Sequence, residues 1–221
     1  KTHKNSHSGI AIIFTTNSGQ NHVNAVYGAN EKKDLSLVDV FNKNIKSTKI
    51  LITQNELDEE ITRECMSIAI ENNIPIILDP APYRDNFDFD YYKMADFITP
   101  NEIESEYMTG IKIQNIEDAK KSANLLVAKG IKNCIITLGE NGAYFKNENF
   151  ENHFKPHKIQ EVKASVAAGD AFSGILGASL ASGEELNKSI DTAIVGSALS
   201  VTKYGAQESM PLYDEIINAI N

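Results

Sequence analysis

The sequence has few of the residues that mark secreted, membrane-spanning or metal-clustering proteins. Its 221 residues include only two cysteines, six prolines and no tryptophan. Cys65 and Cys134 each lie in an apolar segment, so we expect neither a disulfide framework nor a metal-ligand cluster. No apolar run approaches the length of a membrane span, and residues 1–7 lack the apolar core of a signal peptide. These absences favour a globular protein of the reducing cytoplasm, without a membrane partner.

Positive charge is also scarce, with 21 Lys and Arg against 30 Asp and Glu and a formal net charge of -9. This excess of negative charge repels a phosphate backbone, so we expect no nucleic-acid partner. An anionic substrate would need local N–H groups, a few lysines or a metal. The histidines have no metal-ligand spacing, and we assign no chemistry to His3, His7, His22, His153 and His157.

The apolar pattern predicts an α/β fold. The runs 9–14 and 22–27 flank a turn at 17–19 and predict an antiparallel hairpin. Short apolar runs then alternate with helical periodicity, which is typical of a mostly parallel sheet between two helical layers. We expect strands at 49–52, 74–79, 97–99 and 134–138, helices at 58–72, 102–109 and 116–129 (closed by Gly130), a second antiparallel patch from 143–145 and 159–162, and helices at 169–181, 186–202 and 212–220.

Polar residues follow several of the predicted strands. Open α/β sheets bind ligands at the carboxyl ends of their strands, so we expect one shared site there. The residues at these positions are Gln54, Glu56, Asp79, Asn101, Glu104, 139–142 and Asp170.

The most informative stretch is Ser165-Val166-Ala167-Ala168-Gly169-Asp170, a small-residue turn that opens into a helix. Free N–H groups at a helix start attract phosphate, and Asp170 in the first turn could act as a base. A base beside an anion hole is typical of phosphoryl transfer. An ordinary helix start with Asp170 as a capping acid is the alternative.

Three further segments carry two interpretations each. Asn101 and Glu104 lie three residues apart after a strand, which suits a hydrated magnesium ion or a capping box. The turn 137–142 follows an apolar strand and could lie against a nucleotide, although it matches neither the P-loop nor the Gly-x-Gly-x-x-Gly pattern and by itself is a hairpin turn. The loop 201–209 could line a cation site or a purine pocket, or simply connect two helices.

Taken in order, these segments resemble the ribokinase branch of the ribokinase-like (phosphofructokinase-B type) carbohydrate kinases, from about Gly9 to the C-terminus. The resemblance is carried by Asn101-Glu102-Ile103-Glu104, Thr137-Leu138-Gly139 and 165–170 followed by Ala171-Phe172-Ser173-Gly174, with Val201-Thr202 and Gly205-Ala206-Gln207 pointing to the ribokinase branch. It implies a three-layer α/β/α kinase domain at 31–221, a partial β lid at 1–30, and a homodimer formed through that lid.

The resemblance also implies roles for individual residues. Asp170 would deprotonate a sugar's primary hydroxyl, most simply that of D-ribose to give D-ribose 5-phosphate, and Glu56 would contact the sugar. The N–H groups of Ala167, Ala168 and Gly169 would form the anion hole. ATP would bind through Asn101, Thr137, Leu138, Gly139, Glu140, Asn141, Gly142, Gly169 and Asp170, and Mg²⁺ would be held by Asn101 and Glu104, largely through water.

The sequence departs from the family pattern at two places. An acid that helps to hold a monovalent cation is replaced by Ala164, so the potassium site implied at Ala164, Val166, Ser200, Lys203, Gly205 and Ser209 is incomplete, and we expect K⁺ activation to be weak or absent. The family's N-terminal Gly-Gly-Lys-Gly-Ala-Asn sugar motif has no counterpart, because no two glycines are adjacent. We therefore expect a fragment, a truncated form or a chain without its sugar pocket.

An ATP-dependent sugar kinase is the main hypothesis; a nucleotide-binding module without turnover, a fructokinase and a nucleoside kinase are the alternatives.

Overall fold

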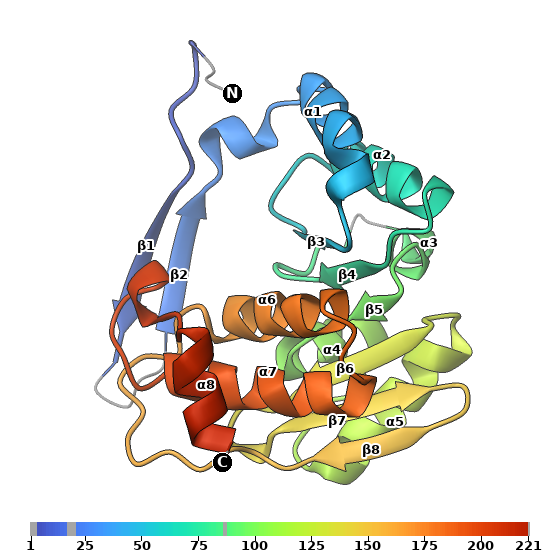
Figure 1. Cartoon of the computed structure of the whole chain (residues 1–221). Coiled ribbons are helices and arrows are strands. Elements are labelled where there is room, and N and C mark those ends of the chain that lie inside the picture. The colour runs from blue at the N-terminus through green and yellow to red at the C-terminus, as the bar shows by residue number, and fades with distance from the viewer. Residues whose placement is uncertain (1–3, 17–20, 86–87, 221) are drawn as a thin grey trace.

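The computed structural model describes residues 4–16, 21–85 and 88–220, which form a two-stranded sheet and a six-stranded sheet with helices around it (Figure 1). The predicted turn at 17–19 lies outside these ranges. The strands are β1 (Ile10–Thr15), β2 (Asn21–Val26), β3 (Leu51–Gln54), β4 (Ile76–Asp79), β5 (Phe97–Ile98), β6 (Asn133–Thr137), β7 (Ala143–Asn147) and β8 (Glu151–Phe154). The helices are α1 (Ser36–Asn44), α2 (Glu59–Glu71), α3 (Phe89–Lys93), α4 (Glu102–Thr109), α5 (Ile116–Ala128), α6 (Ala168–Ala181), α7 (Leu186–Ser200) and α8 (Tyr213–Ile220), with 3-10 turns η1 (Gly28–Glu31), η2 (Ile45–Ser47), η3 (Gly139–Asn141) and η4 (Gln207–Ser209).

The large sheet has the order β3-β4-β5-β6-β7-β8, with parallel pairing from β3 to β6 and antiparallel pairing from β6 to β8. This confirms the predicted α/β fold with a mostly parallel sheet. The second antiparallel patch also exists, but its outer strand is β8 and not the predicted 159–162. The Asn147 side chain accepts hydrogen bonds from the N–H groups of Asn149 and Phe150, and this tight turn reverses the chain earlier than the apolar pattern indicates.

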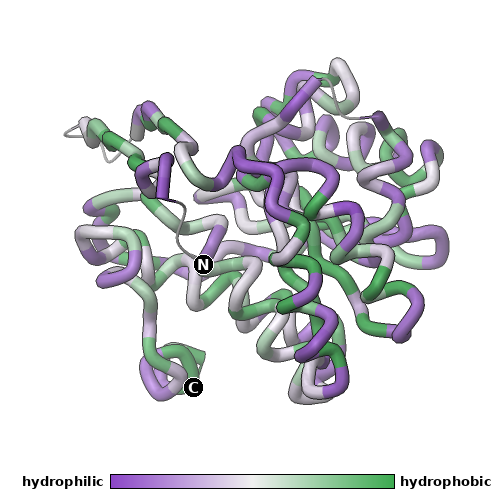
Figure 2. The backbone as a smooth tube through the Cα atoms, turned by 90° about the horizontal axis from the view of Figure 1, so that it is seen from above, coloured by the Kyte–Doolittle hydropathy of each residue, from purple (hydrophilic) through white to green (hydrophobic). Residues whose placement is uncertain are grey.

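Alternate residues of the central strands face opposite helical layers. Ile76 and Leu78 belong to a buried cluster with α2, α3, α4 and α5, whereas Ile77 belongs to a second cluster with α6 and α7. Side chains of a strand alternate between its two faces, so burial on both faces requires the continuous apolar runs seen in the sequence. Hydrophobic and hydrophilic stretches accordingly alternate along the chain (Figure 2). The helical layers on both sides confirm the three-layer sandwich.

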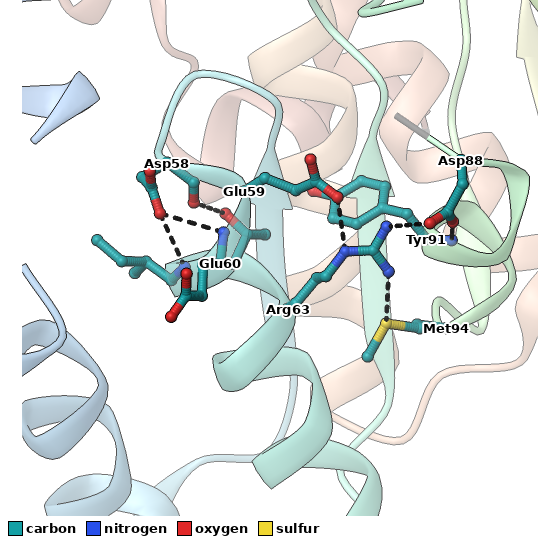
Figure 3. A network of polar contacts seen from close by, with 9 residues as sticks. Asp58, Glu59, Glu60, Arg63, Asp88, Tyr91 and Met94 are labelled. Atoms are coloured by element: carbon teal, nitrogen blue, oxygen red, sulfur yellow. Dashed lines mark hydrogen bonds and ion pairs between the residues drawn. The ribbon is translucent and has the colours of Figure 1, made fainter. Parts of the chain in front are cut away.

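Helix α3 is too short for its periodicity to predict, and contacts from α2 hold it in place (Figure 3). The Arg63 guanidinium of α2 bonds the Asp88 carboxylate at 3.0 Å, and Asp88 caps α3 by accepting the Tyr91 N–H. Arg63 also lies over the Tyr91 ring at 5.0 Å and bonds Glu59 of its own helix at 2.6 Å. This network anchors the end of the loop that follows β4.

The hairpin β1–β2 stands apart from the large sheet (Figure 1). Its return segment is attached to the main body, because the Asp58 N–H donates to the Asn30 carbonyl oxygen. The division into a lid at 1–30 and a kinase domain at 31–221 stays a prediction. Within the described ranges, no helix combines the length and the apolarity needed to cross a membrane.

Candidate active site

The carboxyl ends of the parallel strands meet at one edge of the sheet and bring the predicted polar residues together. Gln54 ends β3 and Asp79 ends β4, and the two residues pair directly in the register of the sheet. Asn101, just after β5, forms a bridge with Thr137 at the end of β6. The buried Thr99 hydroxyl lies 3.1 Å from the Ser173 hydroxyl and ties the end of β5 to α6. The sheet edge and the start of α6 therefore form one site.

The turn before α6 has an unusual backbone. Ala167 is the N-cap residue and adopts the left-handed conformation, with φ 60°. The first regular helical bond joins the Ala171 N–H to the Ala167 carbonyl oxygen, and the Ala168 N–H makes a long contact of 3.4 Å with the Ser165 carbonyl oxygen. The Ser197 hydroxyl of α7 holds the Ala168 carbonyl oxygen at 2.9 Å. The start of α6 is thus fixed with its first N–H groups directed away from the helix, as an anion site requires.

Asp170 lies in the first turn of α6, whose N-cap residue Ala167 makes no side-chain cap bond. Its exposed carboxylate accepts a hydrogen bond of 3.0 Å from the Gln54 side-chain amide. The same amide nitrogen lies 3.3 Å from the Asp79 carboxylate. The Gln54 amide therefore holds the Asp170 carboxylate at the exposed side of the site, where the carboxylate can accept a proton from a ligand.

Several acidic groups crowd this edge of the sheet. Burial, then the charges of Glu104 and Asp170, raise the pKa of Asp79 to about 7, against the lowering effect of the Gln54 and Ala81 hydrogen bonds. Burial raises the pKa of Glu104. Burial and the charge of Asp170 raise the pKa of Glu56, and Arg84 opposes this. Such a cluster favours a cation or a proton among the carboxylates.

Asn101 and Glu104 form a complete capping box at the start of α4. The Asn101 carbonyl oxygen of the side chain accepts the Glu104 N–H at 2.9 Å, and the Glu104 carboxylate accepts the Asn101 N–H at 2.9 Å. The predicted capping box of Asn101 and Glu104 is thus confirmed. Both side chains also line the cleft beside α6, so the cap and a ligand role are compatible.

Three clefts follow one another across the site. The first, of about 330 Å³, includes Asn30, Gln54, Glu56 and Asp170. The second, of about 280 Å³, shares Gln54, Glu56 and Asp170 with the first and extends over Asp79, Asn101, Glu104, Thr137, Ser165, Ala167, Ala168 and Gly169. The third, of about 620 Å³, shares Ser165 with the second and is lined by Gly139, Glu140, Val201 and the segment 156–162. Asp170 lies where the first two clefts meet.

The turn after β6 reaches the third cleft. The Leu138 N–H donates to the Gly142 carbonyl oxygen, and His153 lies 2.8 Å from the Asn141 carbonyl oxygen. Gly142 has φ 85°, and a Cβ there would overlap the Phe154 carbonyl oxygen. The turn is therefore a rigid hairpin, as the sequence alone suggests, with Gly139 and Glu140 facing a cleft large enough for a ligand.

The residues of the predicted potassium site lie around the end of α7. The N–H groups of Lys163 and Ala164 donate to the Val201 carbonyl oxygen, which places Ala164 beside Ser200. Residue 164 is a buried alanine, so it offers a cation no carboxylate. Other side chains of the set have partners: the Ser200 and Ser209 hydroxyls bond carbonyl oxygens, and the Lys203 ammonium pairs with Glu215. Val166 and Gly205 complete the predicted set, and the Glu208 carboxylate lies beside Gly205.

The sequence did not single out two residues that shape the site. Asn55 is buried and fastens the loop after β4, because its backbone N–H and side-chain amide donate to the carbonyl oxygens of Ala81, Pro80 and Pro82 at 2.9–3.1 Å. That loop carries Arg84, which lies 5.4 Å from the Tyr27 ring at the end of β2. The position of Asn55 at a strand end, between Gln54 and Glu56, is the signal that could have identified it.

The chain is similar to carbohydrate kinases over nearly its whole length. Residues 1–212 match the family described as pfkB family carbohydrate kinase. The chain is 33% identical to the ribokinase of Staphylococcus aureus over 212 residues, covering 95% of this chain and 68% of that protein. It is 29% identical to the deoxyribokinase of Salmonella typhimurium over 208 residues, covering 94% of this chain and 68% of that protein.

Solved structures of ribokinases are also similar to this chain. The ribokinase of Thermotoga maritima is 30% identical, with a TM-score of 0.84 over 97% of this chain and 70% of that one. The ribokinase of Arabidopsis thaliana complexed with ribose and ATP shares the fold, with a TM-score of 0.86 over 98% of this chain and 70% of that one, at 21% identity. The sequence resemblance is thus confirmed. The chain belongs to the pfkB family of carbohydrate kinases, which are ATP-dependent phosphotransferases.

Proposed function

We propose that this kinase transfers the γ-phosphoryl group of ATP to the primary hydroxyl of D-ribose and releases D-ribose 5-phosphate and ADP. The observation that carries the proposal is the Asp170 carboxylate, which lies between the first cleft and the N-terminus of α6. The similarity to named ribokinases supports ribose as the sugar. The similarity to deoxyribokinases makes 2-deoxyribose the first alternative to test.

Asp170 acts as the general base in this proposal. Its carboxylate accepts the proton of the primary hydroxyl, whose oxygen forms a bond to the γ-phosphorus as the bond from that phosphorus to the bridging oxygen breaks. The electron pair of the broken bond leaves with ADP. The exposed position of Asp170 at the junction of the first two clefts supports this role, because the sugar and the phosphate would meet there.

The start of α6 forms the anion hole. Ala167, Ala168 and Gly169 line the second cleft, and their backbone N–H groups would donate to oxygens of the transferring phosphoryl group. The Ala168 N–H would exchange its long contact with the Ser165 carbonyl oxygen for this bond. The small side chains leave this backbone accessible. This arrangement supports a position for the γ-phosphate next to Asp170.

The donor set of the second cleft fits a magnesium ion held largely through water. Glu104 and Asp79 are buried carboxylates whose pKa values are raised by burial, and Asn101 adds an amide oxygen. Among the described residues, no group of three acidic, histidine or cysteine side chains is arranged to hold a metal directly. Asn101 and Glu104 would therefore hold the ion through its waters. When bound with ATP, the ion supplies positive charge that neutralises the phosphates.

The third cleft is the place we assign to the nucleotide. Gly139 and Glu140 line it, and the rest of the turn, from Thr137 and Leu138 to Asn141 and Gly142, supports them. Ser165 connects this cleft with the anion hole. A nucleotide lying here would direct its phosphates toward Gly169 and Asp170.

The first cleft is the place we assign to the sugar. Glu56 and Asn30 offer carboxylate and amide groups to sugar hydroxyls, and Asn30 belongs to the segment that returns from the hairpin. Glu56 is exposed, so its carboxylate is accessible to a ligand in this cleft.

We further propose that the β1–β2 hairpin forms a dimer contact. Its apolar residues Ile10, Ile12, Phe14, Val23 and Val26 are each more than half exposed. A two-stranded sheet with exposed apolar side chains and two open edges favours association with a second copy.

One assay tests the proposed reaction. The chain is incubated with Mg²⁺, ATP and one of D-ribose, 2-deoxyribose, fructose or adenosine, and ADP and phosphorylated product are followed. Faster turnover with D-ribose than with the other three acceptors is expected. ATP binding without product from any acceptor would instead favour a nucleotide-binding module without turnover, and faster turnover with another acceptor would reassign the sugar.

A further inference from the structure

One side chain joins two carboxylates of the site and has no role in the chemistry described above. The Gln54 side-chain nitrogen lies 3.0 Å from Asp170 Oδ1 and 3.3 Å from Asp79 Oδ2. A primary amide nitrogen carries two hydrogens, so it can donate to both carboxylates at once. Both partners are acceptors when ionised, and this fixes which end of the amide faces them.

The Asp79 end of this bridge is rigid. Asp79 is 5% exposed, ends a fully buried strand and pairs with Gln54 in the sheet register. Neighbouring residues in a parallel pair project to the same face, so the sheet itself places the amide beside Asp79. The backbone of Ala81 also bonds the Asp79 carboxylate. The amide is therefore anchored independently of α6.

The Asp170 end of the bridge lies at the surface. Asp170 is exposed, and its carboxylate could rotate about two side-chain bonds. The residues before it, Ala167, Ala168 and Gly169, are small. The Gln54 amide supplies a fixed donor for one oxygen of this carboxylate.

We infer that Gln54 is the positioning residue for the general base, holding the Asp170 carboxylate at the junction of the sugar and phosphate clefts. The inference rests on the proposed role of Asp170. A base misplaced by about 1 Å can lose on the order of 100-fold in rate, so a single anchoring bond has a large effect on turnover. Because Gln54 acts through Asp170, its loss should lower kcat and leave the binding of ATP unchanged.

The test compares two substitutions that remove the donor. Gln54→Met keeps the length of the side chain without hydrogen bonds, and Gln54→Glu keeps its shape but replaces the donor by an acceptor. We expect kcat to fall roughly 10- to 100-fold in both variants, with the KM for the sugar and the dissociation constant for ATP close to the wild-type values. Gln114→Met is the matched control, because Gln114 is exposed before α5 and outside the three clefts.

Asp170→Asn in the same assay separates this inference from the proposed function. If Asp170→Asn retains turnover, the base assignment and the inference fall together. If Asp170→Asn abolishes turnover while either Gln54 variant keeps the wild-type kcat, the inference alone is overturned. A large rise in the KM for the sugar at unchanged kcat would also overturn it, because Gln54 would then be a sugar ligand.

Discussion

The acid cluster at the sheet edge predicts that Asp79 makes the stability of the ligand-free protein depend on pH. Burial raises the pKa of Asp79 from 3.8 to about 7, with further contributions from the charges of Glu104 and Asp170. A pKa difference of this size between the folded and unfolded chains corresponds to about 4 kcal/mol in total.

The sign of the change in unfolding free energy with pH depends on whether the folded or the unfolded chain keeps the Asp79 proton to higher pH. The unfolded chain ionises Asp79 near pH 4, whereas the folded chain does so near pH 7. The stabilising contribution is therefore full below pH 4, declines as the pH rises toward 7, and is absent above it. Between about pH 5 and 8 the wild-type protein should lose about 2.5 kcal/mol through this group.

Asp79→Asn removes the ionisable group while keeping an acceptor for the Gln54 amide. Urea unfolding of both proteins is measured from pH 5 to 8, in chelator and without nucleotide, with exposed Asp39→Asn on α1 as the control. The advantage of the wild-type protein over Asp79→Asn should shrink, or reverse, by about 2.5 kcal/mol across this range. Stability curves that stay parallel for wild type and Asp79→Asn would refute the reasoning.

Three shorter predictions concern the backbone and the cation site. Ala167→Val should lower the free energy of unfolding by about 1–2 kcal/mol because a β-branched residue is strained at φ 60°, whereas Ala167→Gly should not; chemical denaturation of the two variants checks this. Gly142→Ala should lower the unfolding midpoint and raise the KM for ATP, and an unchanged KM would separate the turn from the nucleotide site. Exchanging Na⁺ for K⁺ at constant ionic strength should leave turnover unchanged, since Ala164 supplies no carboxylate; marked activation by K⁺ would contradict this.

The sequence predicted the long helices and strands with a strong apolar pattern. It also predicted that the carboxyl ends of the parallel strands lie together at one edge of the sheet. The buried strands β4 and β6 show as unbroken apolar runs, and parallel pairing then brings Asp79 and Thr137 to one edge. Helix α4 was predicted from its helical periodicity, and the capping box that Asn101 and Glu104 form was one of the two interpretations of that pair.

Of what the sequence did not predict, α3 and the role of Gln54 depend on contacts far apart in the sequence, whereas β8 follows from a local turn. Helix α3 is five residues long and is held by Arg63 of α2, and β8 has little apolar character and is set by the Asn147 turn. The role of Gln54 depends on a side chain 116 residues away. Such contacts arise from tertiary packing, which local periodicity does not encode.

Turnover of Asp170→Asn tests the central claim most directly. The variant and the wild type are compared with Mg²⁺, ATP and D-ribose, and ATP binding is measured for each by calorimetry. The account predicts that turnover is abolished while the dissociation constant for ATP is nearly unchanged, because an amide cannot accept the hydroxyl proton but leaves the α6 backbone in place. Undiminished turnover in the variant would contradict it.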